Sequence, residues 1–444
     1  MKTKKNAKFY LALVIFSLVG QVAWVVENMY LNVFIYKMFH ATAEQISFMV
    51  AASAVTATVT TLLVGAFSDK IGKRKVFICA GYILWGISIL GFALIRIDLV
   101  SEVFSFMVVS YTNAIASLCI TLTIALDCLM TFFGSSANDA CFNAWLTDAT
   151  DETNRGSIEG INAMMPLVAI LAVFGGFMGL NQDLQESWTV IFLVIGGAVL
   201  ALGISGFFLV EETAAKNEEN SNYFASIFYG FRPSVIKSNV LLYVTLALLA
   251  LFNISIQIFM PYLILFYTEY LQIENYVLIF APAIVVAAAF TAVYGKVYDR
   301  KGFRFAILPT LAMLIVGYIG LYFFRNMVLV FIFSMIMLCG FLGTGAMIGA
   351  LVRDCTPEKK AGMFQGLRII GQVLIPGVIG PAIGAAILAN ADTIANSDGT
   401  TSFIPNENIF LGALVAIVFA LLALIPLFKL LKKNEIRKES RYAR

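Results

Sequence analysis

Long apolar runs separated by short polar stretches make up most of the chain. Each run is close to the ~20 residues that an α-helix needs to cross a bilayer. The runs lie at approximately 9–36, 45–66, 76–95, 118–146, 157–180, 188–210, 239–268, 275–296, 305–324, 327–351, 363–390 and 408–431. This pattern predicts an all-α membrane protein with 12 transmembrane helices.

A short polar hinge between apolar runs occurs twice, with its glycines, aspartate and arginine at the same spacing. Its members are Gly65, Asp69, Gly72 and Arg74, and then Gly295, Asp299, Gly302 and Arg304. A second signature also repeats, as Asp148, Gly156 and Gly160, and then Asp354, Gly362 and Gly366. Two ordered signatures in each half indicate a duplication. We therefore expect two pseudo-symmetric six-helix bundles.

The duplication suggests where the domains begin and end. We predict an N-terminal bundle at 1–215, a cytoplasmic linker with a possible amphipathic helix at 216–237, a C-terminal bundle at 238–431 and a basic cytoplasmic tail at 432–444. The offsets between the repeated signatures differ, which places an insertion at 96–117. This insertion is either an outer loop packed on the helix ends or a partial lid.

Composition supports a lipid environment. The chain has 444 residues, of which 60% are hydrophobic and 13% charged, whereas soluble domains carry roughly 25% charged residues. With the N-terminus inside, the outer loops hold only Lys37, Arg96 and Arg325 of the basic residues. The positive-inside rule then predicts a multi-pass protein of the cytoplasmic membrane with both termini cytoplasmic.

Several function classes find no support in the sequence. There is no basic soluble domain for nucleic acid, and no P-loop or nucleophile motif of an ATP-driven pump or another enzyme. The six cysteines form no CxxC or metal-like cluster, and we predict free thiols. We expect no metal or cofactor, no obligatory protein partner, and contact mainly with the lipid bilayer and a small solute.

The repeated hinge resembles the signature loop of the major facilitator superfamily, G-x-x-x-D-x-x-G-x-R-[RK]. The resemblance covers nearly the whole chain and implies a transporter in which two six-helix halves alternate access to a central cavity. Gly65 and Gly295 would allow helices to approach closely. Asp69 and Asp299, beside Arg74 and Arg304, would make charge contacts that change between states.

A narrower resemblance covers the segment from Asn138 to Gly156, which is similar to helix 4 and the following loop of the glycoside–pentoside–hexuronide:cation symporters. That group, which includes melibiose permease, carries a membrane aspartate where Asp139 falls. The resemblance implies cation-coupled sugar transport. The chain departs from the group's sodium-using members, since its second run has no carboxylate and Gln21 stands near the depth of the group's helix 1 acid.

Acids inside the runs are the first candidates for chemistry, because a charge in a span costs roughly 2.5–3.5 kcal/mol. At ~1.5 Å per residue, Asp139 lies about 14 Å from Asp148, near the midplane. We predict that Asp139 binds substrate or a proton, the alternative being an acid fixed by Asn138 or Asn143. The same count places Asp127 near the outer surface, where solvent can hydrate it.

Other polar residues could line the same cavity. Glu27 with Asn28 lies in the outer half of the first run. The remaining candidates are Asn143, Gln21 and Trp145 in the first half, and Asn253, Gln257, Arg368 and Gln372 in the second. Arg368 could pair with a cavity acid or extend to the inner surface. The only histidine, His40, is predicted outside, so a coupled proton would have to use carboxylates.

These observations favour a secondary active transporter that moves a sugar or glycoside, coupled to H⁺, with Na⁺ left open as the ion. One alternative keeps the fold and changes the solute to a drug, peptide or amino acid, with possible export. A membrane sensor that transports nothing is a third reading.

Overall fold

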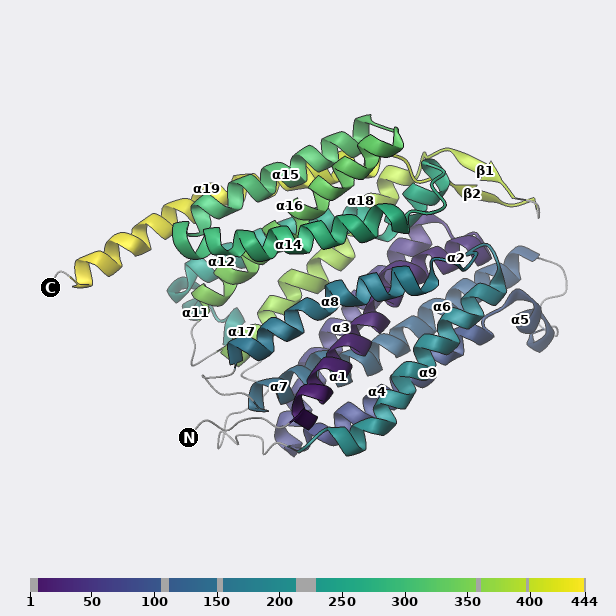
Figure 1. Cartoon of the computed structure of the whole chain (residues 1–444), viewed down its shortest axis with the longest axis horizontal. Helices are drawn as coiled ribbons and strands as arrows, with labels where there is room; N and C mark the ends of the chain where they lie inside the picture. The colour runs from purple at the N-terminus through teal and green to yellow at the C-terminus, as the bar shows by residue number, and fades with distance from the viewer. Residues whose placement is uncertain are drawn as a thin grey trace. The chain divides into compact units, whose positions relative to one another are not determined.

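The computed structural model describes residues 7–104, 112–149, 155–212, 229–356, 361–396 and 399–442. The chain divides into two compact units (Figure 1). The first contains residues 1–221 together with Thr393–Phe403, and the second contains residues 222–392 and 404–444. The boundary between the two units falls within the predicted linker at 216–237. The other predicted domain boundaries stay a prediction.

The first unit is helical throughout its described residues, apart from the two strands that it gains from residues 393–403. One continuous helical run consists of α1 (Ala7–Val25), a π-helix (Val26–Tyr30) and α2 (Leu31–Phe39). It is followed by α3 (Ala43–Ile71), α4 (Arg74–Gly91) and the short α5 (Ile97–Val103). The unit continues with α6 (Thr112–Gly134), a second π-helix (Ser135–Phe142), α7 (Asn143–Ala149), α8 (Arg155–Phe177) and α9 (Gln185–Leu209).

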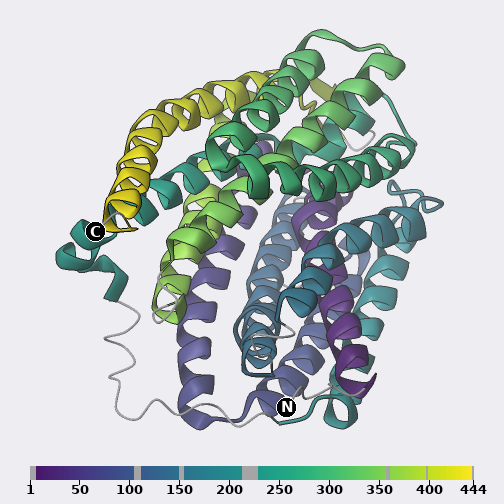
Figure 2. The ribbon, with the colours of Figure 1, turned by 60° about the vertical axis from the view of Figure 1, so that its left-hand side comes forward.

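The second unit repeats this build. It begins with α11 (Pro233–Ser238), α12 (Val240–Phe259), α13 (Leu263–Leu265) and a π-helix (Phe266–Tyr270). It continues with α14 (Val277–Lys301), α15 (Phe303–Phe323), α16 (Met327–Cys355), α17 (Ala361–Ile369), a π-helix (Ile370–Leu374), α18 (Ile375–Leu388) and α19 (Asn408–Tyr442). Helix α19, yellow in Figure 2, bends along its length and contains Pro426, which cannot donate a helical hydrogen bond.

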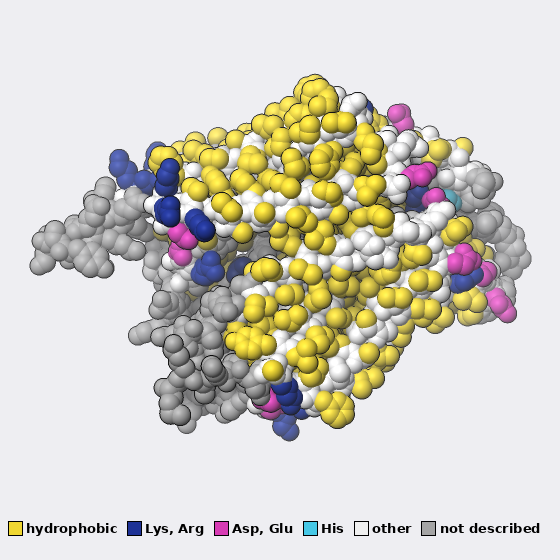
Figure 3. Space-filling model, viewed as in Figure 1, with side chains coloured by type: hydrophobic (Ala, Val, Ile, Leu, Met, Phe, Trp, Pro, Cys, Tyr) yellow, Lys and Arg dark blue, Asp and Glu magenta, His cyan; other side chains and the backbone are white. Residues whose placement is uncertain are grey.

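Among the described residues, 11 helices are long and apolar enough to cross a membrane, and Ile161–Phe177 in α8 is a shorter apolar helix. These 12 segments match the predicted runs, which confirms the all-α membrane fold. On the face drawn in Figure 3, apolar side chains cover the middle of the helices and charged side chains gather at the helix ends. Large apolar side chains also stay exposed among the described residues, as a lipid solvent allows: Phe208 is 75% exposed and Phe305 is 68% exposed.

Glycines set how closely neighbouring helices approach. Helices α4 and α9 lie side by side, as do α15 and α16 (Figure 1). A Cβ at Gly86 would lie 2.5 Å from the backbone nitrogen of Leu200, and one at Gly317 would lie 2.5 Å from the Cβ of Met337. By contrast, a Cβ at Gly65 would lie 3.9 Å from its nearest neighbour, and one at Gly295 would meet nothing within 4 Å. Neither Gly65 nor Gly295 makes a close helix contact within its own unit, and their role in helix approach stays a prediction.

The other glycines of the repeated hinge have a backbone role. Helix α3 ends at Gly72, whose φ of 69° is left-handed, and α14 ends at Gly302, whose φ is 75°. Glycine adopts this conformation without the steric penalty that a Cβ brings. The repeat thus keeps glycine where a spanning helix must stop and the chain must reverse.

A β-hairpin from the end of the chain packs on the first unit. Strand β1 (Thr393–Ala395) pairs antiparallel with β2 (Thr401–Phe403), in the register Thr393 to Phe403. The Tyr36 hydroxyl donates to the Phe403 carbonyl at 2.6 Å, and the two rings meet edge to face. His40, at the end of α2, lies 3.2 Å from the Ser402 hydroxyl. The hairpin therefore joins the first unit although its chain neighbours belong to the second.

The predicted insertion contains α5, which packs against α6. At its start, the partly exposed Arg96 donates two hydrogen bonds to Asp98 at 3.1 Å, and this contact lowers the pKa of Asp98. Residues 105–111 of the insertion lie outside the described residues, as do residues 213–228, which hold most of the predicted linker and its possible amphipathic helix. All six cysteines are free, as predicted.

Candidate functional site

Two buried acids from different helices meet inside the first unit. Glu27 lies in the π-helix of the first run and is 8% exposed, and Asp127 on α6 is 2% exposed. Ser53 on α3 donates to Glu27 Oε1 at 2.6 Å, and Thr131 on α6 donates to the same oxygen at 2.9 Å. Ser53 also interacts with the Asp127 carboxyl. Three helical segments thus converge on a cluster of oxygen atoms.

The cluster has more short oxygen–oxygen contacts than its hydroxyl groups have hydrogens to donate. Ser53 Oγ and Thr131 Oγ1 lie 2.7 Å apart, and both lie within 2.9 Å of Glu27 Oε1. Each hydroxyl carries a single hydrogen. Glu27 Oε2 and Asp127 Oδ1 are buried and have no hydrogen-bond partner within the described structure. Both oxygens therefore lie in the interior at an energetic cost, because buried polar atoms without partners are unfavourable.

The electrostatic surroundings of the cluster are acidic. Glu27 and Asp127 lie close enough to interact electrostatically, and Asp139 acts on Glu27 as well. No Lys, Arg or His among the described residues contributes to the electrostatics of either carboxyl. Lys37 on the neighbouring α2 pairs with Asp183 at 2.7 Å. Two ionised carboxylates cannot remain together in an apolar interior without compensation.

The burial of Asp127 corrects the sequence analysis. Counting residues along one helix placed this acid near the outer surface, where water could hydrate it. In the structure, Asp127 is instead covered by neighbouring helices, and its residue is only 2% exposed. The count gave the position along α6 but carried no information on which helices cover that position.

Asp139 lies in the second π-helix and is partly exposed. Its carboxyl accepts a hydrogen bond from Ser135 at 3.0 Å. Asn138 donates instead to the Tyr82 hydroxyl at 2.6 Å, and Asn143 donates to the backbone carbonyl of Asp139 at 3.2 Å. The two asparagines therefore do not fix the Asp139 carboxyl.

Both candidate acids of the first unit, Glu27 and Asp139, lie in π-helical segments. A π-helical turn inserts a residue into the helical hydrogen-bond pattern and is found frequently at functional sites. The sequence analysis missed these turns. It also missed Ser53 and Thr131, whose hydroxyls are common in membrane helices and carry no distinguishing signal until the helices are packed.

The other first-unit candidates do not all share one environment. Asn28 is exposed and donates to the Trp24 carbonyl at 2.8 Å, while Gln21 is partly buried. Trp145 is only 1% exposed, and its indole nitrogen donates to the Glu211 carbonyl at 2.8 Å. Its ring packs on Phe142, at 5.7 Å between centroids. Trp145 therefore fills the core in this structure.

The second-unit candidates lie on two helices. Asn253 on α12 is partly buried and donates to the Leu249 carbonyl at 3.0 Å, and Gln257 follows on the next turn. Gln257 packs on Gly380 of α18, where a Cβ would lie 2.5 Å from the Gln257 Cβ. Arg368 on α17 donates to the Gln372 side chain at 3.2 Å. The structure thus brings Arg368 and Gln372 together.

The repeated signatures meet in the first unit. Arg74 is 5% exposed, and its Nε lies 3.2 Å from Asp148 Oδ2, so the first signature pairs with the second. Arg74 also donates to the Ser68 hydroxyl. In the second unit, Asp354 accepts from the Tyr298 hydroxyl at 2.5 Å, and Arg304 donates to the Phe428 carbonyl at 3.0 Å. The two halves use equivalent residues with different partners.

Residues able to hold a transition metal are not grouped. The described residues contain no cluster of three or more His, Cys, Asp or Glu side chains with that geometry. The prediction that the protein carries no cofactor is untested. The oxygen cluster around Glu27 is therefore the candidate site of this unit, with Asp139 as a neighbouring, more accessible acid.

The fold is that of a multi-pass membrane protein, and the family comparison identifies its class. The sequence model of the Major Facilitator Superfamily matches residues 10–352. The chain belongs to this superfamily, which indicates a transporter and not an enzyme. No curated protein sequence matches the chain.

Solved structures of transporters share the fold. A bacterial homolog of the human lysosomal transporter Spinster, inward-facing and unoccupied, aligns with a TM-score of 0.68 at 15% identity, over 95% of this chain and 96% of that chain. The nucleoside transporter NupG aligns with a TM-score of 0.67 at 12% identity, over 96% and 100%. A D-xylose-proton symporter aligns with a TM-score of 0.70 at 13% identity, over 94% and 97%. At these identities the likeness shows the fold alone.

Proposed function

We propose that the protein is a secondary active transporter that carries a sugar or glycoside across the cytoplasmic membrane, coupled to H⁺. The observation that carries this proposal is the pair of buried acids in the first unit, which no basic residue among the described ones compensates. In a membrane helix such acids are costly and mark ion or substrate pathways. A carrier that loads and releases a proton explains why they are retained.

Asp139 is proposed as the acid that meets the solute. It is partly exposed within a spanning helix, and its carboxyl is held by a single hydroxyl, that of Ser135. Carboxylates accept hydrogen bonds from hydroxyl groups, and a sugar presents several. The electrostatic effect of Asp139 on Glu27 would let solute binding and proton binding influence each other.

The solute class rests on chemistry and on likeness together. A D-xylose-proton symporter is among the structures that share the fold, and the melibiose permease group resembles the helix that carries Asp139. The likeness to NupG favours nucleosides as a second candidate, since their ribose also presents hydroxyls. Both termini are proposed to be cytoplasmic, from the distribution of Lys and Arg.

Uptake into proteoliposomes tests this proposal. Labelled D-xylose, a disaccharide and a nucleoside would be offered under an imposed inward proton gradient, with a labelled drug and an amino acid as comparisons. We expect one of them to accumulate, and we expect Asp139→Asn to reduce its uptake at least tenfold while Glu102→Gln, on the exposed α5, leaves uptake unchanged. Accumulation of a drug or amino acid in place of these solutes would contradict the sugar assignment.

A further inference from the structure

We propose that one end of the second unit binds the phosphate head group of an anionic phospholipid. This cationic surface consists of the end of α14, the start of α15 and residues 429–433 of α19. Its basic members are Lys296, Arg300, Lys301, Arg304, Lys429, Lys432 and Lys433. The inference goes beyond the proposed transport function, because it concerns a lipid and not the transported solute.

The fold brings the two parts of the cationic surface together. Helices α15 and α19 pack against each other. Arg304 donates to the Phe428 carbonyl at 3.0 Å, although 124 residues separate them, and the rings of Phe303 and Phe428 lie 6.4 Å apart. Lys429 follows directly on Phe428. Figure 3 shows Lys and Arg side chains gathered at this end of the helices that Figure 1 labels α14, α15 and α19.

Few acids accompany these basic residues. Within the stretches 296–305 and 425–433, Asp299 is the one acid beside seven basic residues. Asp354, at the end of the neighbouring α16, accepts a hydrogen bond from the Tyr298 hydroxyl at 2.5 Å. The surface therefore carries an excess of positive charge, which attracts an anion.

The repeat-related end of the first unit carries acids beside its basic residues. Arg74 lies 3.2 Å from Asp148, and the Lys8 amine lies 3.5 Å from Glu211. Both acids reduce the positive charge at that end. The duplication thus kept basic residues in both hinges, and the charge excess is larger in the second unit.

One face of α19 has the same order of chemistry as a phospholipid. Leu422 and Ile425 are each 54% exposed, and Lys429 and Lys432 are exposed as well. These four positions recur at helical spacing and share one face. The face changes from apolar to cationic between Ile425 and Lys429. Acyl chains would lie along the apolar part, with the phosphate at the lysines.

The α14–α15 turn repeats this order on a second helix. The Lys301 amine lies 5.7 Å from the centroid of the Phe305 ring, which is 68% exposed. Leu308, one turn further along α15, is 49% exposed. Both helices therefore offer apolar side chains for acyl chains next to cations for a head group.

A lipid head group fits this surface better than a soluble anion. Clusters of four to eight Lys and Arg beside a membrane helix attract anionic lipids, and each contributes to binding. Lys and Arg donate charge-assisted hydrogen bonds to phosphate oxygens. A soluble anion such as inorganic phosphate would use the cations alone and leave the exposed apolar side chains unused.

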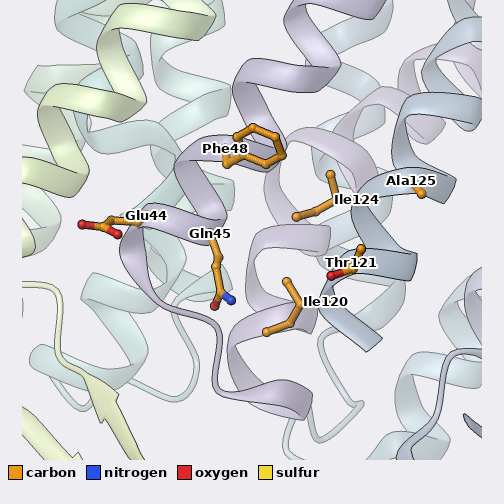
Figure 4. Close-up of a pocket in the computed structure, with 7 residues that line it drawn as sticks. All are labelled: Glu44, Gln45, Phe48, Ile120, Thr121, Ile124 and Ala125. Carbon is orange, nitrogen blue, oxygen red and sulfur yellow. The ribbon is translucent and has the colours of Figure 1, made fainter. Parts of the chain in front are cut away.

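The groove described here for the first unit lacks such chemistry. A pocket of 480 Å³ between α3 and α6 (Figure 4) is lined by Glu44, Gln45, Phe48, Ile120, Thr121, Ile124 and Ala125. Its one charged lining residue is Glu44, which repels an anionic head group. We therefore assign the lipid to the cationic surface of the second unit.

Native mass spectrometry of the full-length protein in detergent tests the proposal. Phosphatidylglycerol and phosphatidylcholine with the same acyl chains would be titrated separately, and the bound lipid counted at each concentration. We expect phosphatidylglycerol to bind at least tenfold more tightly, with a preference that falls as the ammonium acetate concentration rises, since salt screens exposed charges. Inorganic phosphate at the same concentration should not displace the lipid.

Matched variants locate the site. Lys429→Gln with Lys432→Gln should weaken phosphatidylglycerol binding about 20-fold, at about fivefold for each lysine. Lys70→Gln with Lys73→Gln removes the same charge from the hinge of the first unit and should leave the affinity within twofold of the wild type. Lys429→Arg with Lys432→Arg keeps the charge and should keep tight binding, which separates a charge effect from a change in folding.

Three results would overturn the proposal. One is equal affinity for the two lipids, and another is a loss in the first-unit variant as large as that in the α19 variant. Displacement of the lipid by inorganic phosphate would assign the surface to a soluble anion instead. The measurement needs no solute, so failure of the sugar assignment does not affect it.

Discussion

The hydroxyl of Ser53 contacts several members of the acidic cluster in the first unit. Ser53 contacts Glu27 and Thr131 and acts on Asp127, although it has one hydrogen to donate. Its position on α3 means that any shift of this helix changes the surroundings of both acids.

The variant Trp145→Phe distinguishes a role of Trp145 in solute binding from a role in the packed core. Trp145→Phe removes the indole hydrogen bond to the Glu211 carbonyl, and such a bond contributes about 0.5–1.5 kcal/mol to stability. We expect a lower melting temperature in detergent with an unchanged apparent affinity for the solute. A loss of affinity at unchanged stability would place Trp145 in the solute site instead.

Single residues also show what the sequence could not reveal. The cost of charge in a membrane singled out Glu27 and Asp139, and the structure places both inside spanning helices. Ser53 and Thr131 gave no signal because a hydroxyl becomes a ligand only when another helix brings an acid to it. Asp127 was misjudged for the same reason, since depth along one helix does not determine burial.

At the level of helices, the glycines of the repeated hinge divide into two kinds. Gly72→Ala and Gly302→Ala place a Cβ at a left-handed φ, and such strain costs about 1–3 kcal/mol. Gly65→Ala and Gly295→Ala add a methyl group where no atom is crowded. We expect the first pair to lower the melting temperature and the second pair to leave it nearly unchanged. Equal losses in all four variants would contradict the division.

The ion pair between the two signatures gives a second prediction about helices. Asp148→Asn removes the charge opposite the buried Arg74, and breaking a buried pair costs about 3–5 kcal/mol, toward the low end here because Asp148 is partly exposed. The repeat-related Asp354→Asn is the matched control, since Asp354 accepts from a neutral tyrosine. Thermal unfolding should show the larger loss for Asp148→Asn. The reverse order would contradict this assignment of the two contacts.

The helices themselves were predictable to a large extent. Twelve apolar runs sufficed because lipid leaves a polar backbone no alternative to helices over such lengths. The π-helical turns were not predictable, since they depend on contacts between helices and not on local propensity. The hairpin at 393–403 was also missed, because its short polar strands are fixed by Tyr36 and His40 of a distant segment.

At the scale of the molecule, the hairpin belongs to the first unit although the chain on either side of it belongs to the second. It packs on the first unit while α18 and α19 on either side belong to the second. Tyr36→Phe removes the hydrogen bond to Phe403 but keeps the ring contact. A net loss of about 1 kcal/mol should speed amide hydrogen exchange of residues 393–403 about fivefold, and Tyr36→Ala should speed it further. Unchanged exchange in both variants would show that Tyr36 does not hold the hairpin.

The central claim is that this member of the Major Facilitator Superfamily couples a polar solute to a cation through acids of its first unit. The most direct measurement is the external pH of energy-depleted cells that express the protein, as sugars and nucleosides are added one at a time. We predict alkalinisation with one of them, absent in cells that carry Asp139→Asn or Glu27→Gln. Silence across the panel, with and without Na⁺ and with no uptake of labelled solute, would contradict the account.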